Sequence, residues 1–358
     1  MFVVSAALLH NLGINKIRKI RKRKHSVTRP AAPADAHLGR IVQLLSSYAT
    51  VVVSGTKIAS EIGTSRSEVW RLVQELRGLG VDIAGHPATG YQLKSMPDLL
   101  LPEILAPLVQ GTIFSKHIHH FYKIGSTNTA AMEAASAGAP EGSVFVAEQQ
   151  SAGRGRAANQ WHSARAGIYC SVVLRPALPP SDVLVLALAG GLAVQAAVQE
   201  IDSRVQVDLK WPNDLLIEGK KFCGILTEMN AEVTCVRHVV AGFGINVNQA
   251  SFPPDLAPIA TSLRLATGSE WSRVELCGAL LKSLDSEYRN LLENQDARRS
   301  ILQRFQERSS SVRGSHVHIE GNGGFEGVTE GLDARGFLQV RTAQGLRTVL
   351  SGTVRTKA

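Results

Sequence analysis

Cysteine is scarce in this sequence, and none of the cysteines lies close to another. The 358 residues include four, Cys170, Cys223, Cys235 and Cys277, and contain no Cys-x-x-Cys pair. Structural zinc sites and the disulfide frameworks of small secreted domains both need closely spaced cysteines. The spacing argues against both, so we expect no protein-bound metal site. Scattered single cysteines fit a reducing compartment, and we therefore expect a cytoplasmic protein.

Two common nucleotide-binding signatures are also missing. The sequence contains neither Gly-x-x-x-x-Gly-Lys-Ser/Thr nor Gly-x-Gly-x-x-Gly. The first signature cradles phosphates in P-loop proteins, and the second opens the dinucleotide-binding helix of Rossmann domains. Any nucleotide that this chain binds must therefore be held by another arrangement of residues.

Acidic residues are absent from the first thirty positions, which hold eight basic ones. The formal net charge is +9, but removing these eight from the 39 lysines and arginines leaves 31, against 30 aspartates and glutamates. The basicity therefore belongs to an arm, residues 1–36, and not to a folded surface. The apolar run Phe2–Leu9 precedes the charges, unlike in a secretory signal, and is too short to span a membrane. We expect a disordered or weakly helical arm; contact with a polyanion or a membrane surface is the alternative.

The periodicity after the arm predicts a DNA-binding domain over residues 37–95. Three helix-like segments precede two strand-like ones, "VDIAG" and "GYQLK", which is the order of a winged helix-turn-helix. Ser65 and Glu68 have the spacing of a capping box at the start of the third helix. The candidate DNA contacts on its turn and outer face are Ser65, Arg66, Ser67 and Arg71. Glu68 and Glu75 oppose phosphate binding, and a protein-binding or dimerisation domain is the alternative interpretation.

The remainder of the chain divides into three segments. Residues 96–110 contain three prolines and are interpreted as a linker. In residues 111–304 strand-like runs alternate with helix-like ones, which predicts a mixed α/β domain with its own buried sheet. Residues 305–358 consist of short strands separated by glycine turns, and they predict a small β-barrel. We therefore assign the whole chain to the α+β (mixed) class.

Four polar or glycine-rich motifs interrupt the central segment. They are "GSTNT" (125–129), "QSAGRGRAANQW" (150–161), "KWPNDLLIEGKKFCGIL" (210–226) and "GFGINVN" (242–248). A helix start such as that in "GSTNT" offers free N–H groups to anions, and the guanidinium groups of "GRGR" suit phosphate or carboxylate oxygens. Lys210 and Lys221 lie on different predicted strands and can converge on one negative centre. The loop that contains "GRGR" is therefore expected to close over a phosphate.

The histidines His117, His119 and His120 are the other closely spaced group of potential ligands. Neither a cysteine nor a carboxylate accompanies them, and their spacing is that of a strand. We interpret them as part of a solvated strand rather than as metal ligands.

In this order the four motifs resemble those of the biotin protein ligase family. With a winged helix before them and a small β domain after them, the chain looks like the bifunctional members, in which a biotin ligase is also the biotin operon repressor. The resemblance extends from about residue 38 to the C-terminus. It implies an SH3-like C-terminal barrel and an enzyme that forms biotinyl-5′-AMP from biotin, ATP and Mg²⁺, then transfers biotin to a lysine of a biotin carboxyl carrier domain. Operator DNA, and a homodimer when loaded with the adenylate, are implied as further partners.

The resemblance also implies a role for each matching residue. The residues that would hold biotin are Ser126, Thr127, Asn128, Gln150, Arg154, Gly155, Arg156 and Lys221. The residues that would contact ATP or the adenylate are Arg154, Arg156, Trp161, Lys210, Asn213, Asp214, Gly244 and Asn246. The catalytic residues would be Lys221, Lys210 and Arg156, because fixed cations stabilise the charge that develops at phosphorus.

The loop departs from the family pattern after its second arginine. Family members commonly continue with a further Gly/Arg-containing triplet, whereas this chain has Ala157, Ala158 and Asn159. The sequence therefore leaves open whether DNA binding depends on biotin. Two alternatives are a lipoate or octanoyl-type carrier acylating enzyme of the same fold and a ligand-sensing transcription factor without catalysis. The combination of "KWPND" and "GRGR" argues against the first, and the full set of cations argues against the second.

Overall fold

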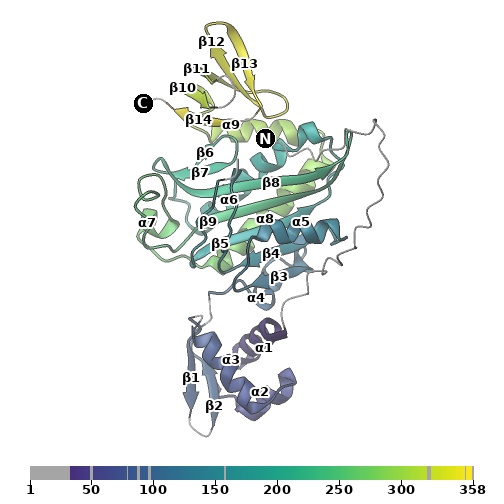
Figure 1. Ribbon diagram of the computed structural model, residues 1–358, viewed down its shortest axis with the longest axis vertical. Coiled ribbons are helices and arrows are strands. Elements are labelled where there is room, and N and C mark those ends of the chain that lie inside the picture. Colours follow the sequence, from purple (N-terminus) through teal and green to yellow (C-terminus); the bar gives the residue numbers. More distant parts are fainter. Residues whose placement is uncertain are drawn as a thin grey trace, which may run out of the picture.

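The computed structural model describes residues 33–48, 51–78, 80–86, 89–95, 98–156, 159–320, 324–350 and 352–356. Residues 1–32 of the predicted arm lie outside the described residues, and so do Ala157 and Ala158. The described parts follow one another along the long axis of Figure 1: a small helical part, a large sheet with helices on both faces, and a small sheet.

The N-terminal part is a winged helix-turn-helix. The Ser54 and Ser65 hydroxyls accept hydrogen bonds from the backbone N–H groups of Lys57 and Glu68, and they cap the second and third helices. Gly63 ends the second helix at φ 74°, a left-handed conformation that costs glycine little. The elements are α1 (Pro33–Ser47), α2 (Gly55–Ile62), α3 (Arg66–Gly78), β1 (Ile83–His86) and β2 (Gly90–Leu93).

A seven-stranded sheet forms the centre of the molecule, in the order β3-β4-β5-β9-β8-β7-β6. Only the β3–β4 pairing is parallel; the others are antiparallel. The sheet is therefore mixed, as expected for an α/β domain. The strands are β3 (Ile118–Phe121), β4 (Val144–Ala147), β5 (Gly167–Leu174), β6 (Asp208–Lys210), β7 (Asp214–Ile217), β8 (Lys220–Ala231) and β9 (Val236–Asn246).

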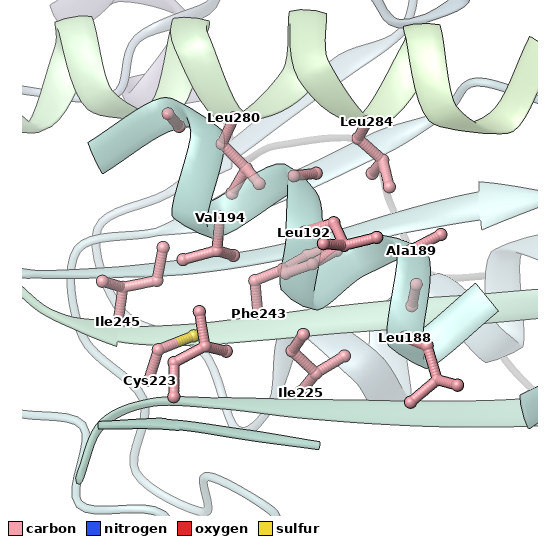
Figure 2. Packing of buried hydrophobic residues seen from close by; sticks show 14 of the residues in the cluster. Leu188, Ala189, Leu192, Val194, Cys223, Ile225, Phe243, Ile245, Leu280 and Leu284 are labelled. Atoms are coloured by element: carbon pink, nitrogen blue, oxygen red, sulfur yellow. The ribbon is translucent and has the colours of Figure 1, made fainter. Parts of the chain in front are cut away.

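Helices cover both faces of this sheet. Helix α6 is apolar on nearly all sides because it lies between the sheet and α8; Figure 2 shows its side chains between Phe243 and Leu280. Its length and composition would suffice to cross a membrane, but 78% of the apolar window is buried, as in a core helix. Helix α5 covers part of the other face. The helices are α4 (Pro102–Leu108), η1 (Ile113–Ser115), α5 (Thr127–Ser136), η3 (Pro180–Asp182), α6 (Leu184–Ile201), α7 (Leu263–Thr267), α8 (Arg273–Glu293) and α9 (Ala297–Glu307).

The C-terminal part is a five-stranded antiparallel sheet in the order β13-β12-β11-β10-β14. Its pairings leave β13 and β14 at the edges, so closure into the expected barrel stays a prediction. Helix α9 runs through position 305, at which the sequence predicts the start of this domain, and that boundary stays a prediction. The strands are β10 (Arg313–Glu320), β11 (Phe325–Leu332), β12 (Leu338–Thr342), β13 (Gly345–Val349) and β14 (Thr353–Thr356).

The segment that the sequence predicts as a linker packs into two different hydrophobic cores. Leu99 and Leu101 belong to the core of the winged helix, whereas Leu100 between them belongs to the core of the central domain. Asp98 pairs with Arg273 at the start of α8. Consecutive side chains of the connection therefore serve two different cores.

Candidate active site

The predicted site residues converge on one cavity of about 510 Å³. It lies on the face of the sheet where α5 begins, and strands β8 and β9 contribute its floor. The predicted residues that line it are Ser126, Thr127, Asn128, Gln150, Arg154, Gly155, Arg156, Trp161, Lys210, Asn213, Asp214, Lys221 and Gly244.

Asn246 is the exception, because it does not line this cavity. It is buried, and its side-chain amide donates to the backbone carbonyl of Thr261 at 3.0 Å. The Thr261 N–H in turn donates to the carbonyl of Lys221. The predicted contact of Asn246 with the ligand stays a prediction, and in this structure the residue supports the strand that carries Lys221.

The start of α5 and the end of β4 form one wall of the cavity. Ser126 is the N-cap of α5, and Gln150 Oε1 accepts hydrogen bonds from the N–H and the hydroxyl of Thr127 at 2.8 and 3.1 Å. The Gln150 amide nitrogen donates to Ser163 Oγ at 2.9 Å. One glutamine side chain thus joins the helix start to the segment that returns from the "GRGR" loop.

Asn128 is held in place by three partners on two strands, β5 and β8. Its Oδ1 accepts from the Ser171 hydroxyl at 2.6 Å, and its Nδ2 donates to the Leu226 carbonyl and to Glu228 Oε2 at 3.2 and 3.1 Å. A Cβ at Gly242 would lie 1.8 Å from Oδ1, closer than any real contact. Glycine at position 242 is therefore required for Asn128 to reach the floor.

Trp161 lies against two further floor glycines. A Cβ at Gly244 would approach its indole ring to 2.6 Å, and one at Gly224 would approach it to 3.0 Å. The register pairs these glycines across β8 and β9. Lys221 Nζ lies 5.2 Å from the centre of the indole ring, within reach of a cation–π interaction. The glycines of "KKFCGIL" and "GFGINVN" thus admit the tryptophan that follows the loop.

Two cations lie near the carboxylate and the amide of "KWPND". Lys221 Nζ pairs with Asp214 Oδ1 at 2.6 Å, across the β7–β8 hairpin. Arg156 Nη1 donates to Asn213 Oδ1 at 2.9 Å. Burial lowers the pKa of Arg156, and the nearby charge of Asp214 opposes this shift. The hairpin therefore positions cations from two segments at the same end of the cavity.

Arg154 has a different partner from Arg156. Its two terminal nitrogens donate to the carboxylate of Glu228 on β8, at 3.1 and 2.8 Å. The sequence predicts both loop arginines at the adenylate, and no motif marks Glu228. A glutamate in a strand is common, so only its contacts distinguish it.

The C-terminal part also contributes to the cavity. Glu320, Gly352, Thr353 and Val354 line it, from β10 and the beginning of β14. These residues belong to no recognisable motif and lie 72 to 106 positions after the end of the last one, at Asn248. The sequence therefore gave no signal that would have found them.

The outer face of α3 differs from its prediction in one respect. Ser65, Arg66 and Ser67 are exposed, as a DNA contact requires. Arg71 is paired with both Glu68 and Glu75, at 2.7 and 3.0 Å. Trp70 was not predicted, but 59% of it is exposed. An aromatic residue outside the apolar stripe of this helix was the signal that could have identified it.

The expectation of a solvated histidine strand is wrong for His120. This residue is buried, and its Nε2 lies 3.0 Å from Glu148 Oε1, while Arg273 Nη1 donates to Glu148 Oε2 at 2.7 Å. Burial acts to raise the pKa of Glu148, but the hydrogen bond with His120 and the charge of Arg273 outweigh it and lower that pKa. In the described part of the chain, no group of three or more His, Cys, Asp or Glu side chains could hold a metal ion.

Three family models match the chain in the order of its three parts. Residues 38–92 match a helix-turn-helix domain, residues 120–246 match the biotin/lipoate A/B protein ligase family, and residues 313–355 match the biotin protein ligase C-terminal domain. The central match contains all four motifs except the last two residues of "GFGINVN".

Several curated proteins are similar over most of the chain. The bifunctional ligase/repressor BirA of Bacillus spizizenii is 36% identical over 88% of this chain and 97% of its own length. The protein of the same name from Escherichia coli is 27% identical over 80% and 87%, respectively. A biotin–[acetyl-CoA-carboxylase] ligase of Mycobacterium tuberculosis is 35% identical over 60% of this chain and 79% of its own.

Among solved structures, the biotin protein ligase of Aquifex aeolicus in complex with biotin and ATP is similar to about two thirds of this chain. It is 29% identical, with a TM-score of 0.59, and the match covers 68% of this chain and all of that one. The similarity is therefore one of fold and of sequence.

Proposed function

We infer the function from the family: this chain belongs to the biotin protein ligases and has the organisation of their bifunctional ligase/repressor members. It is an ATP-dependent ligase that activates biotin as biotinyl-5′-AMP and attaches it to a lysine of a carrier protein, and it carries a repressor-type DNA-binding domain. The observation that carries this function is the cavity, where the cations of "GRGR", "KWPND" and "KKFCGIL" meet around one space.

We propose that Lys221, Lys210 and Arg156 act at the reacting phosphorus. In the first half-reaction a carboxylate oxygen of biotin attacks the α-phosphorus of ATP, and the bond to the bridging oxygen breaks, so that pyrophosphate leaves. Negative charge grows on the phosphoryl oxygens, and cations that are already fixed in a partly buried cavity stabilise it without reorganising. Asp214 and Asn213 hold Lys221 and Arg156 in position for this role.

In the second half-reaction the neutral amine of the carrier lysine attacks the acyl carbon of the anhydride. The bond to the phosphate oxygen breaks, AMP leaves with the electron pair, and the nitrogen loses a proton. The anhydride must be protected from water until then, and the "GRGR" loop can cover it. The described ends of this loop already approach each other, since the Gly155 N–H donates to the Asn159 carbonyl at 2.7 Å.

We place biotin at the α5 end of the cavity and the nucleotide at the hairpin end. Ser126, Thr127, Asn128 and Gln150 provide the polar groups at the first end, where the helix start favours an acceptor-rich ligand. Trp161, Lys210, Asn213, Asp214 and Gly244 lie at the second end. Gly155 and the two loop arginines lie between the ends in sequence and are available to both parts of the adenylate.

Magnesium is proposed as part of the substrate complex with ATP. A dedicated protein cage for it is not seen among the described residues. Magnesium commonly keeps several waters and binds through substrate phosphates with one or two carboxylates, and Asp214 is the carboxylate that could assist.

The direct test is to incubate the full-length protein with biotin, ATP and Mg²⁺, with and without a biotin carboxyl carrier domain. We expect biotinyl-5′-AMP and pyrophosphate without the carrier, and biotinylated carrier with it. Lipoate in place of biotin tests the alternative acylating enzyme. Activation of lipoate but not biotin would overturn the assignment, and DNA binding without any adenylation would favour the sensor without catalysis.

We further propose operator DNA and a second copy of the chain as partners. Helix-turn-helix proteins usually read two half-sites as dimers, and the adenylate can favour the dimer only if it binds that state more tightly. Gel shifts on a palindromic site, at fixed salt, should show tighter binding with biotin and ATP than with biotin alone. Equal binding under all conditions would leave a DNA-binding ligase without a biotin switch. We place both activities in the cytoplasm.

A further inference from the structure

The two arginines of the "GRGR" loop are bound at different places. Arg156 donates to Asn213 beside the catalytic hairpin, whereas Arg154 forms two parallel hydrogen bonds to Glu228 on β8. A guanidinium that meets a carboxylate through two nitrogens is fixed in orientation as well as in position. The pair therefore defines where the first half of the loop lies against the sheet.

The same carboxylate has a second partner on the wall of the cavity. Glu228 Oε2 accepts a hydrogen bond from Asn128 Nδ2 at 3.1 Å. Asn128 is itself fixed by the Ser171 hydroxyl and by the Leu226 carbonyl. One side chain thus joins the loop to the helix start at which we place biotin, although Glu228 is not among the residues that line the cavity.

We propose that Glu228 is a positioning residue that anchors the "GRGR" loop through Arg154 and ties this anchor to the biotin end of the cavity through Asn128. This inference rests on the proposed ligase function. It assigns the arginines different work: Arg154 holds the loop to the sheet, and Arg156 faces the phosphoryl group. Glu228 itself does not touch the reacting atoms.

The anchor acts on the position of the loop and not on the stability of the fold. The Arg154 side chain is 48% exposed, and ion pairs of this exposure contribute little to the free energy of unfolding. The position of a loop that covers a reactive anhydride is sensitive to a loss of interaction energy too small to unfold the protein, because each opening of the loop lets the intermediate escape. Loss of the anchor should therefore appear as release of biotinyl-5′-AMP.

The experiment compares Glu228→Gln, Glu228→Ala, Arg154→Gln and the double variant Arg154→Gln/Glu228→Gln in the full-length protein. Free biotinyl-5′-AMP and biotin on an added bystander protein should rise roughly 5- to 10-fold in each single variant, as expected for loss of a charge-assisted contact. The double variant should resemble the single ones, because both remove one interaction. Glu228→Gln keeps an acceptor for Asn128, so the KM for biotin should rise in Glu228→Ala and much less in Glu228→Gln.

Glu232→Gln is the matched control, since Glu232 follows the same strand and forms an exposed pair with Arg237 away from the cavity. It should release no more adenylate than the wild type. A double variant whose release is the product of the single effects would overturn the inference, because Arg154 and Glu228 would then act separately. Wild-type release from Glu228→Gln would overturn it as well. Failure of the wild type to activate biotin at all would instead contradict the proposed function.

Discussion

The catalytic cavity and helix α3 both contain cations beside carboxylates, but they differ in how completely the charges are matched. The cavity is lined by four cations, Arg154, Arg156, Lys210 and Lys221, and by two carboxylates, Asp214 and Glu320. On α3 one cation, Arg71, is paired with the two carboxylates Glu68 and Glu75. The cavity therefore keeps positive charge for an incoming anion, whereas the centre of α3 has little to offer a phosphate. Ligand binding in the cavity should therefore depend mainly on charge, whereas DNA binding by α3 should depend more on the exposed aromatic residue Trp70.

Removal of Lys221 should produce the largest effect. We expect Lys221→Ala to reduce adenylate formation by about 10²-fold or more, comparable to the loss of one charge-stabilising donor. The variant should still fold. Adenylate formation is measured as release of pyrophosphate. Lys220→Ala is the control, since Lys220 is adjacent in the hairpin but exposed. Near wild-type adenylation by Lys221→Ala would refute the role of the cavity charges.

Glu148 and Arg273 form a third kind of charged pair, which is both matched in charge and buried, and it should contribute to the stability of the fold. Glu148→Gln removes the buried partner charge of Arg273 and leaves only the half-exposed Asp98 as its charged partner. Loss of a buried ion-pair partner typically costs about 3 kcal/mol of unfolding free energy. The pKa of Glu148 is lowered in the folded state, so its stabilisation is present above the unfolded value, near 4.3, and is lost as pH falls below it. Denaturant unfolding should show a difference from the wild type that is large at pH 7 and narrows below about pH 4. A constant difference would contradict the ionic origin of this stability.

Replacement of Arg156 tests the other side of the cavity. Arg156→Gly should keep some adenylation but release roughly 10-fold more biotinyl-5′-AMP, because the loop loses its contact with the phosphoryl end. Labelling of bystander lysines in the same tube is the measurement. If only the carrier is labelled, the second arginine does not retain the intermediate.

Trp70 offers the corresponding test on α3. Trp70→Ala should weaken operator binding by about 10-fold, since an exposed aromatic side chain on a recognition helix can contact base edges and thymine methyl groups. The effect should be smaller on unrelated DNA, which is bound mainly through phosphates. An equal loss of affinity for the operator and for unrelated DNA would mean that Trp70 makes a contact that does not depend on the base sequence.

The smallest effect is expected for Arg71. Arg71→Ala removes an exposed cation that is already neutralised, so the thermal unfolding midpoint should change by no more than about 2 °C. Operator affinity should fall by less than for Trp70→Ala. A larger loss would mean that Arg71 leaves its glutamates on DNA, and the proposed contrast between the two regions would fail.

The order and type of the elements could be predicted because each has a local cause. Ser54, Ser65 and Gly63 mark helix ends through their own hydrogen bonds and backbone angles. The main part of the cavity could be predicted because four compact motifs supply it, and Asn246 is the one residue predicted from them that does not line it.

The remaining features depend on contacts between distant segments. Glu228 becomes significant only because Arg154, 74 positions away, reaches it. The residues from β10 and β14 reach the cavity through packing of the C-terminal sheet, and no pattern in their own segment indicates it. The prolines of the predicted linker indicated a connection, but the assignment of its leucines to two cores depends on both partners.

The shared connection gives the chain a fixed geometry. Leu99 and Leu101 pack into the core of the winged helix, and Leu100 packs into the core of the central domain. Rotation of one domain relative to the other would therefore expose these leucines to water. In a pair of such chains the separation of the two recognition helices would be set by how the catalytic domains meet. Half-sites are read about one turn of DNA apart or at multiples of it, so in such a dimer the contact between the catalytic domains would determine the operator spacing. Residues inserted between Asp98 and Pro102 would then change the separation of the two recognition helices without changing any residue that contacts DNA.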